Sequence, residues 1–394
     1  MKTIARILAA ALLLHIIIPT VAAAQFRRYT WLTKPAYCPP PPEQPLVQIA
    51  LLLDTSNSMD GLIAQAKTQL WNIVKELAST KRNGQTPRIE LALYEYGNDR
   101  IPVTAGYIRQ VSPFTSDLDN ISDALFKLTT NGGSEYSPMA IRHACMNLTW
   151  NQDSDNLRFL FIAGNERFAQ GSVTIRQACE AAKQKNVSVT TIHCGDEATG
   201  RSDGWDGLAD CTGGNYFCIN TDTPQRFIAT PYDTAIVRLN GKLNGTYMGY
   251  GAAGAAVKLI QQRQAANSSS MATANLADRA AAKVSAAYSN ATWDVVDAVK
   301  SKKLDVATAK PADLPAELQQ LQPAERVKKV EEITKQRAAI QKEMEEVEKK
   351  RQAYIAQEEA KDATSAAQKS TSLQSKISAA LRQNATAKGY TFTK

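Results

Sequence analysis

The chain has 394 residues, which is enough for one large domain with an addition or for two domains. Its formal net charge of +8 is unevenly distributed, with a net −4 over residues 47–240 and a net +8 over residues 241–394. Acidic residues are interspersed at helical spacing in the basic region, and no compact basic patch with aromatic residues occurs, so we expect no nucleic-acid partner.

The first 24 residues have the pattern of an export signal peptide. Lys2 and Arg6 precede the apolar run Ile7–Ile18, and Val21-Ala22-Ala23-Ala24 supplies small residues before the expected cleavage. An uncleaved anchor is the alternative. No later stretch has the roughly 20 apolar residues of a membrane helix, so no membrane span is expected after cleavage. The expected location is the periplasm or the cell surface of a bacterium.

Residues 25–46 form a proline-rich leader, in which Cys38-Pro39-Pro40-Pro41-Pro42 favours an extended spacer. From Val47 onwards predicted strands alternate with predicted helices. We expect strands over 47–53, 89–96, 157–163, 187–193 and 215–219, and helices over 62–79, 117–128, 139–148, 175–185 and 224–243. Several strands are continuously apolar, as in parallel sheets covered on both faces. The sequence therefore predicts a doubly wound, mostly parallel α/β domain over residues 47–243.

The composition changes after residue 243. Four glycines predict a flexible junction over 244–270, and residues 271–394 predict an all-α region without strands. Within it we expect an Ala-rich helix over 271–300 and a long amphipathic helix over 325–359. Apolar residues follow a heptad pattern in the long helix, but Arg337 and Arg351 interrupt it. The helix either folds back on a neighbour or forms a dimeric coiled coil, so the oligomeric state stays open.

The six cysteines suggest disulfides in an exported chain. Cys145 and Cys179 fall on successive predicted helices and are one candidate pair. Cys211 and Cys218 bracket a turn and are another, which leaves Cys38 and Cys194 over. Six cysteines allow 15 connectivities, and the sequence does not choose among them.

The loop Asp54-Thr55-Ser56-Asn57-Ser58 follows the first apolar strand. Its carboxylate and two hydroxyls alternate, so they can converge on one point. Oxygen groups at the carboxyl end of a parallel strand suit a cation such as Mg²⁺. Helix capping is the alternative interpretation. Capping needs one such residue, however, whereas three alternate here.

A second loop, Asn131-Gly132-Gly133-Ser134, precedes a predicted helix and adds the hydroxyl of Ser134. Asp-x-Ser-x-Ser after a buried strand, followed by Gly-Gly-Ser before a helix, resembles the von Willebrand factor A (VWA) domain. The resemblance implies a Rossmann-like fold with a metal-ion-dependent adhesion site. In such a site Asp54, Ser56, Ser58 and Ser134 would bind Mg²⁺ (or Mn²⁺ or Ca²⁺), and a carboxylate of a protein partner would complete the coordination.

The third loop departs from the family pattern. Ala163-Gly164-Asn165-Glu166 stands where the family usually shows Thr-Asp-Gly, and Gly164 or Asn165 occupies the position of the expected acid. Either Glu166, one or two residues later, reaches the ion or its surroundings, or the third ligand is missing. Asn165, Glu135 and Glu95 are expected around the ligands or at the rim of the site. The strings 163–171, 93–98 and 191–195 are similar to a bacterial subset of exported VWA proteins.

These observations predict an exported binding protein that recognises a protein partner through a divalent cation. The alternative is an envelope scaffold whose metal site is vestigial and whose C-terminal helices carry the interactions. His193 and Cys194 end a predicted strand and raise the possibility of a thiol hydrolase. No set of nucleophile, base and orienting group is evident, so we expect no enzyme and no catalytic residue.

Overall fold

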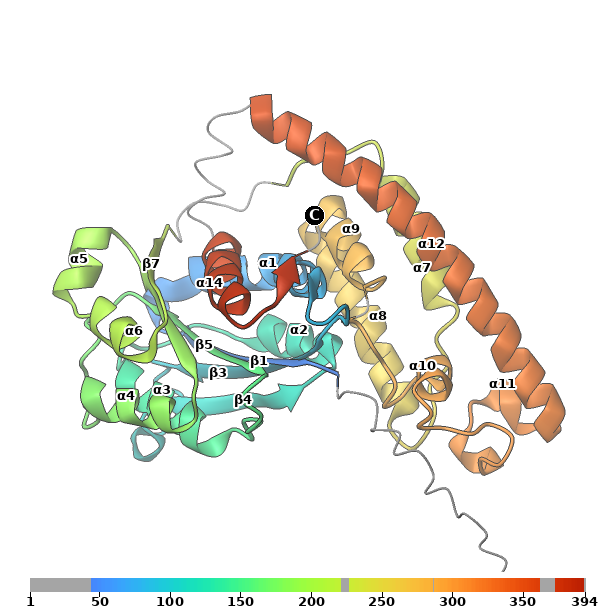
Figure 1. Ribbon diagram of the computed structural model, residues 1–394, viewed down its shortest axis with the longest axis horizontal. Coiled ribbons are helices and arrows are strands. Elements are labelled where there is room, and N and C mark those ends of the chain that lie inside the picture. The colour runs from blue at the N-terminus through green and yellow to red at the C-terminus, as the bar shows by residue number, and fades with distance from the viewer. Residues whose placement is uncertain (1–43, 221–226, 286, 362–372, 393–394) are drawn as a thin grey trace, which may run out of the picture. The chain divides into compact units, whose positions relative to one another are not determined.

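A mixed six-stranded sheet in the order β4-β3-β1-β5-β6-β7 organises the N-terminal half of the protein (Figure 1). The computed structural model describes residues 44–392 apart from 221–226, 286 and 362–372. The expected signal peptide and nearly all of the leader lie outside these residues. Five strands run parallel: β1 (Leu46–Asp54), β3 (Arg88–Tyr96), β5 (Leu157–Gly164), β6 (Ser188–Cys194) and β7 (Tyr216–Ile219).

The edge strand β4 (Ile108–Thr115) pairs antiparallel with β3 and was not expected from the sequence. It carries Pro113 and is only partly buried, which an edge strand tolerates because one side of its backbone needs no partner. The predicted doubly wound, mostly parallel sheet is otherwise confirmed. Each of its five predicted strands is present with its bounds shifted by at most one residue.

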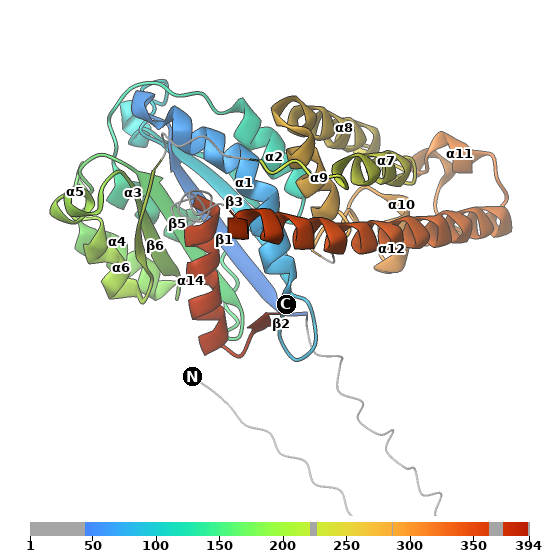
Figure 2. The same ribbon diagram turned by 90° about the horizontal axis from the view of Figure 1, so that it is seen from above.

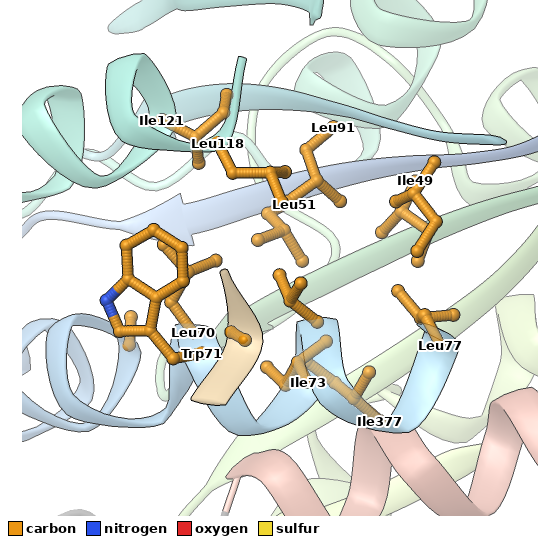
Figure 3. Packing of buried hydrophobic residues seen from close by; sticks show 14 of the residues in the cluster. Ile49, Leu51, Leu70, Trp71, Ile73, Leu77, Leu91, Leu118, Ile121 and Ile377 are labelled. Atoms are coloured by element: carbon orange, nitrogen blue, oxygen red, sulfur yellow. The ribbon is translucent and has the colours of Figure 1, made fainter. Parts of the chain in front are cut away.

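Helices cover both faces of this sheet. One face is packed by α1 (Asp60–Ala78) and α2 (Leu118–Lys127), and the other by α3 (Ser137–Asn147), α4 (Ile175–Gln184) and α6 (Asp206–Thr212), with α5 (Glu197–Ser202) after β6. Successive side chains of β1 enter opposite cores, Leu51 on the α1 side and Leu52 on the α3 side. Figure 3 shows Leu51 packed among apolar residues of α1.

The rest of the chain is helical. Its elements are α7 (Asp233–Asn244), α8 (Gly254–Met271), α9 (Thr273–Ala282), α10 (Val295–Lys300), α11 (Ala316–Gln319), α12 (Pro323–Lys361) and α14 (Leu373–Ala387). Short 3₁₀ turns occur at Asn57–Met59, Val103–Ala105 and Pro311–Asp313. Figure 2 shows α12 running alongside α7, which it contacts. Among the described residues no helix is both long and apolar enough to cross a membrane.

Two expectations for this region were wrong. Much of the predicted flexible junction 244–270 is helix α8. The glycines there allow close backbone approach, since a Cβ on Gly254 would lie 2.7 Å from the carbonyl carbon of Gly249. The single helix expected over 271–300 is two helices, α9 and α10. The first ends at Ala282, and the second begins at Val295, where the Asp294 side chain caps it by accepting a bond from Asp297 N.

The C-terminal helix α14 is part of the cover of the sheet. It packs on α1, and Ile377, Leu381 and Tyr390 are buried in the same core as β1 (Figure 3). After it, β8 (Thr391–Phe392) pairs with β2 (Thr80–Lys81), so the expectation of no strand beyond residue 243 was wrong. The predicted boundary at 243 does not separate two packing units, because residues from Gln44 to the end form one compact unit.

The arginines that interrupt the heptad pattern of α12 are buried. Arg337 pairs with Asp294 at 2.7 Å, and Arg351 pairs with Asp233 at 2.7 Å and with Asp278 at 2.8 Å. Val330 and Met344 are buried on the same side of the helix. This side of α12 therefore folds back on its own chain.

The disulfide joins α4 to α6 through Cys179 and Cys211, whose Cα atoms are 6.3 Å apart. Both pairings expected from the sequence were therefore wrong. Cys145 and Cys218 are not disulfide-bonded, and neither is Cys194. Cys38 lies outside the described residues. The helices α3 and α4 do pack on each other, but Cys145 of α3 is buried in the core, and Cys179 of α4 meets Cys211 of α6 instead.

Candidate metal centre

The loops after β1 and before α3 are held together at the carboxyl edge of the sheet. Asp54 is the last residue of β1, and its Oδ1 accepts a hydrogen bond of 2.8 Å from Ser56 N. Two backbone bonds join the loops: Asn57 N donates to Gly132 O at 3.1 Å, and Asn131 N donates to Thr55 O at 2.9 Å. The predicted meeting of the two loops is thus present in the structure.

Two carboxyl groups face each other beneath these loops. Asp54 is fully buried and Glu135 is 2% exposed. Burial raises the pKa of both groups, and the adjacent Asp54 helps to raise the pKa of Glu135 to about 10. Among the described residues, no N–H or hydroxyl group donates to Asp54 Oδ2 or Glu135 Oε2, and the two carboxyl groups lie within hydrogen-bonding reach of each other. Buried carboxyl oxygens without partners are costly, so they indicate a missing ligand or a bound proton.

Glycines make room for this pair. A Cβ on Gly97, which has a φ of +79°, would lie 2.6 Å from Asp54 Oδ1. A Cβ on Gly164 would lie 2.4 Å from the Tyr96 hydroxyl and 3.0 Å from Asp54 Oδ2. The Tyr96 hydroxyl donates to Ala163 O at 3.0 Å and is itself fully buried. A side chain at 164, one of the two positions expected for the acid of the third loop, would therefore collide with the Tyr96 hydroxyl.

Hydroxyl and amide groups continue the site towards the surface. Ser56 Oγ lies 3.3 Å from Ser58 Oγ, and Asn165 Nδ2 donates to Ser58 Oγ at 3.0 Å. Ser56 is buried, whereas Ser58 is exposed and Asn165 is partly exposed. Asn165, expected only near the ligands, thus contacts a predicted ligand directly.

The structure changes the roles expected of the three glutamates. The Glu166 side chain is exposed, and its backbone carbonyl accepts a bond from Trp205 Nε1 at 2.8 Å. Glu135, expected at the periphery, lies against Asp54 instead. Glu95 is ion-paired with Arg109 and accepts a bond from Thr55 Oγ1 at 3.4 Å, so it supports the first loop from behind.

Ser134 lies partly exposed on the second loop, next to Glu135. Tyr96, which forms a wall of the site, was not expected there from the sequence. Its one signal was a hydroxyl at the last position of a strand, followed by Gly97.

The pair His193 and Cys194 lacks the properties of a hydrolytic centre. Burial raises the pKa of the Cys194 thiol well above its usual value, so the thiolate needed for attack is disfavoured. Burial also lowers the pKa of His193, whose ring packs on Trp205 with ring centroids 5.7 Å apart.

The oxygen groups at this edge fit a divalent cation of the Mg²⁺ type. They comprise two carboxyl groups with unpartnered oxygens, two hydroxyls and an amide, all of which are hard ligands. No group of three or more His, Cys, Asp and Glu side chains in the described part of the chain is placed to hold a metal. Serine hydroxyls and water would therefore have to complete the coordination.

Residues 48–223 match the family model of the von Willebrand factor type A domain. This part of the chain is therefore a VWA domain, and the resemblance noted from the loop sequences is confirmed. A comparison with curated protein sequences finds no match.

Among solved structures, the chain is similar to proximal thread matrix protein 1 from the mussel byssus, in a structure with a zinc-occupied MIDAS motif. The sequence identity is 12% and the TM-score is 0.33, and the match covers 46% of this chain and 43% of that one. It is also similar to a von Willebrand factor type A protein from Catenulispora acidiphila, at 13% identity and a TM-score of 0.34, covering 45% and 39%. The chain thus spans less than half of either protein.

An aerotolerance-related membrane protein from Bacteroides fragilis matches at 14% identity and a TM-score of 0.31, covering 44% of this chain and 92% of that one. Nothing about the ligands of this chain follows from likenesses at this level.

Proposed function

We propose that this protein is a cation-dependent binding protein that recognises a carboxylate of a protein partner. The cation, Mg²⁺ in the first instance and Mn²⁺ or Ca²⁺ as alternatives, would be held by Asp54, Ser56, Ser58 and Glu135 at the edge of the VWA sheet. The observation that supports this most is the pair of adjacent buried carboxyl groups of Asp54 and Glu135, whose Oδ2 and Oε2 receive no bond from an N–H or hydroxyl group of the described residues.

Electrostatics explains why a cation suits this pair. Two carboxylates in one buried place cannot both ionise unless a positive charge lies between them. Among the described residues no Lys or Arg forms an ion pair with Asp54 or Glu135. The negative charge of the pair would therefore be neutralised either by a proton on one carboxyl group or by a bound cation. The structure therefore supports a site in which Glu135 replaces the acid that the third loop lacks.

The surface beside the pair suits a protein partner. Ser58, Glu166 and residues 102–105 of the loop 97–107 are exposed there, and Val103 is 62% exposed. The loop is joined to the second loop by a bond of 3.3 Å from Asp99 N to Asn131 O. A bound Mg²⁺ keeps several positions for water or an incoming carboxylate. Ser134 and Glu166 would lie around the partner rather than beneath the ion.

Export agrees with the disulfide between Cys179 and Cys211, because disulfides persist in oxidising compartments. We therefore place the protein in the bacterial periplasm or on the cell surface. The alternative of a scaffold acting through its helices gains less support. The apolar and arginine-bearing side of α12 is buried against the same chain.

Isothermal titration of the protein with Mg²⁺ or Mn²⁺ tests the proposal. We expect one cation to bind per chain and Asp54→Asn to abolish binding. The control is Asp60→Asn, six positions further along the chain. It removes an exposed carboxylate, whose Oδ1 accepts a bond from Thr130 Oγ1 at 2.6 Å. Equal loss in both variants, or no binding to the unmutated protein, would end the proposal.

Partner binding is tested by crosslinking with and without EDTA in extracts that contain the envelope. Capture that disappears in EDTA and in Asp54→Asn supports a cation-held carboxylate. Capture that persists in both would instead point to the helices.

A further inference from the structure

A cavity of about 600 Å³ opens in the helical part of the chain, between α10, the segment that follows it and α12. Its volume is within the range of about 300–1,000 Å³ that small-molecule sites occupy. Its floor is made of branched apolar side chains, which are buried or half-buried: Val296, Val299, Leu304, Val306, Val327 and Val330. These belong to a separate small core around Met248 and Leu318, which the cavity interrupts.

The rim of the cavity is positively charged. Lys300, Lys302 and Lys335 line it and are exposed, and among the described residues none of them forms an ion pair. Two acids also line the rim. The Asp305 carboxylate is used within its own turn, where it accepts bonds from Ala307 N at 2.9 Å and Thr308 Oγ1 at 3.0 Å. Glu331 is the other acid, so the lysines exceed the acids at the mouth.

Lys302 occupies a backbone position that favours glycine. Its φ is +56°, in the left-handed region, where it ends α10 with its N–H bonded to Val299 O at 3.0 Å. Helices commonly end on glycine at such a position. A lysine there keeps an ammonium group at the rim despite the backbone strain, which agrees with a role in binding.

From this apolar floor and lysine rim we propose that the cavity between α10 and α12 binds a single-chain amphiphile with an anionic head group. The chain would lie against the valines, and the head group would meet the lysines. Apolar cavities with a few charged groups at one end hold ligands of this shape, because burial of the chain supplies affinity and the charges fix orientation. This site is independent of the loops at Asp54.

Decanoate is the probe, used below its micelle-forming concentration in EDTA and titrated calorimetrically into the full chain. Decyltrimethylammonium, with the same chain and the opposite charge, is the comparison. We expect one decanoate to bind per chain. Decyltrimethylammonium should bind more weakly than decanoate by about tenfold or more, as close charge pairs predict. Equal binding of the two amphiphiles, or no decanoate binding, would overturn the proposal.

Two exposed positions give variants that should fold. Lys300→Glu together with Lys302→Glu should weaken decanoate binding by about tenfold or more. Lys328→Glu with Lys329→Glu is the matched control, because both residues are exposed on α12 and do not line the cavity. Thr334→Trp should fill the cavity and abolish binding, while circular dichroism shows that folding is retained. Unchanged binding in Thr334→Trp would place the ligand elsewhere and overturn the proposal.

Discussion

Buried acids among the packed helices (α2, α7, α9, α10 and α12) and buried acids at the loop edge of the sheet have opposite surroundings. Among these helices each buried acid meets an arginine: Asp119 pairs with Arg279 at 2.6 Å, and Asp294 pairs with Arg337 at 2.7 Å. At the loop edge Asp54 and Glu135 are equally buried but face each other. Burial of charge alone therefore does not mark a functional site. Two buried acids that face each other do mark a candidate site, because both can be ionised only when a cation arrives.

The largest effect is expected where a paired charge loses its partner. Arg337→Ala leaves Asp294, which is fully buried, without its arginine, so we expect a loss of about 3–5 kcal/mol in the free energy of unfolding. Urea denaturation measures it. Arg382→Ala removes an ion pair with Glu76 whose arginine is 58% exposed, and should cost less than about 1 kcal/mol. Similar losses in both variants would contradict the role given to buried pairing.

A somewhat smaller effect is expected where α14 covers the sheet. Leu381→Ala should lower the free energy of unfolding by about 2–5 kcal/mol, because the side chain is buried in the core shared with β1. Thr386→Ala, on the exposed side of the same helix, is the control. A cost below about 1 kcal/mol for Leu381→Ala would mean that α14 is an appendage rather than part of the domain.

The loop edge should respond to a new acid according to the space available. Gly164→Asp restores the residue type usual in the family, but its side chain would collide with the Tyr96 hydroxyl. We expect a loss of about 1–3 kcal/mol in stability and no gain in cation affinity.

The matched change is Asn165→Asp, which places the acid one residue later against Ser58, where there is room. It should tighten Mn²⁺ binding roughly fivefold, as one added charge at a partly exposed site predicts. Tighter binding by Gly164→Asp than by Asn165→Asp would show that Tyr96 does not exclude the acid.

Much of the sheet could be predicted from the sequence because its strands are continuously apolar and its helices are periodic. The run Ile49–Leu53 and the loop at Asp54 thus indicated both the strand and the site at its end. The buried side of α12 also followed the heptad pattern. Its arginines looked like interruptions, however, because their acidic partners come from distant helices.

Other features depend on tertiary contacts that no local pattern encodes. The Cys179–Cys211 bond requires the packing of α4 on α6, and the place of α14 follows from its packing on α1. The positions of the Glu135 and Glu166 side chains, buried and exposed respectively, have a similar origin. Tyr96 fills the space in front of Gly164, and the loop before α3 carries Glu135 into the core.

The central proposal is that Glu135, rather than Glu166, shares a cation with Asp54. Calorimetric titration of Mn²⁺ into Glu135→Gln and Glu166→Gln compares two neutralised glutamates of the same edge. We expect Glu135→Gln to weaken binding by about tenfold or more, and Glu166→Gln to change it by about threefold or less. Loss of binding in Glu166→Gln with normal binding in Glu135→Gln would contradict the account.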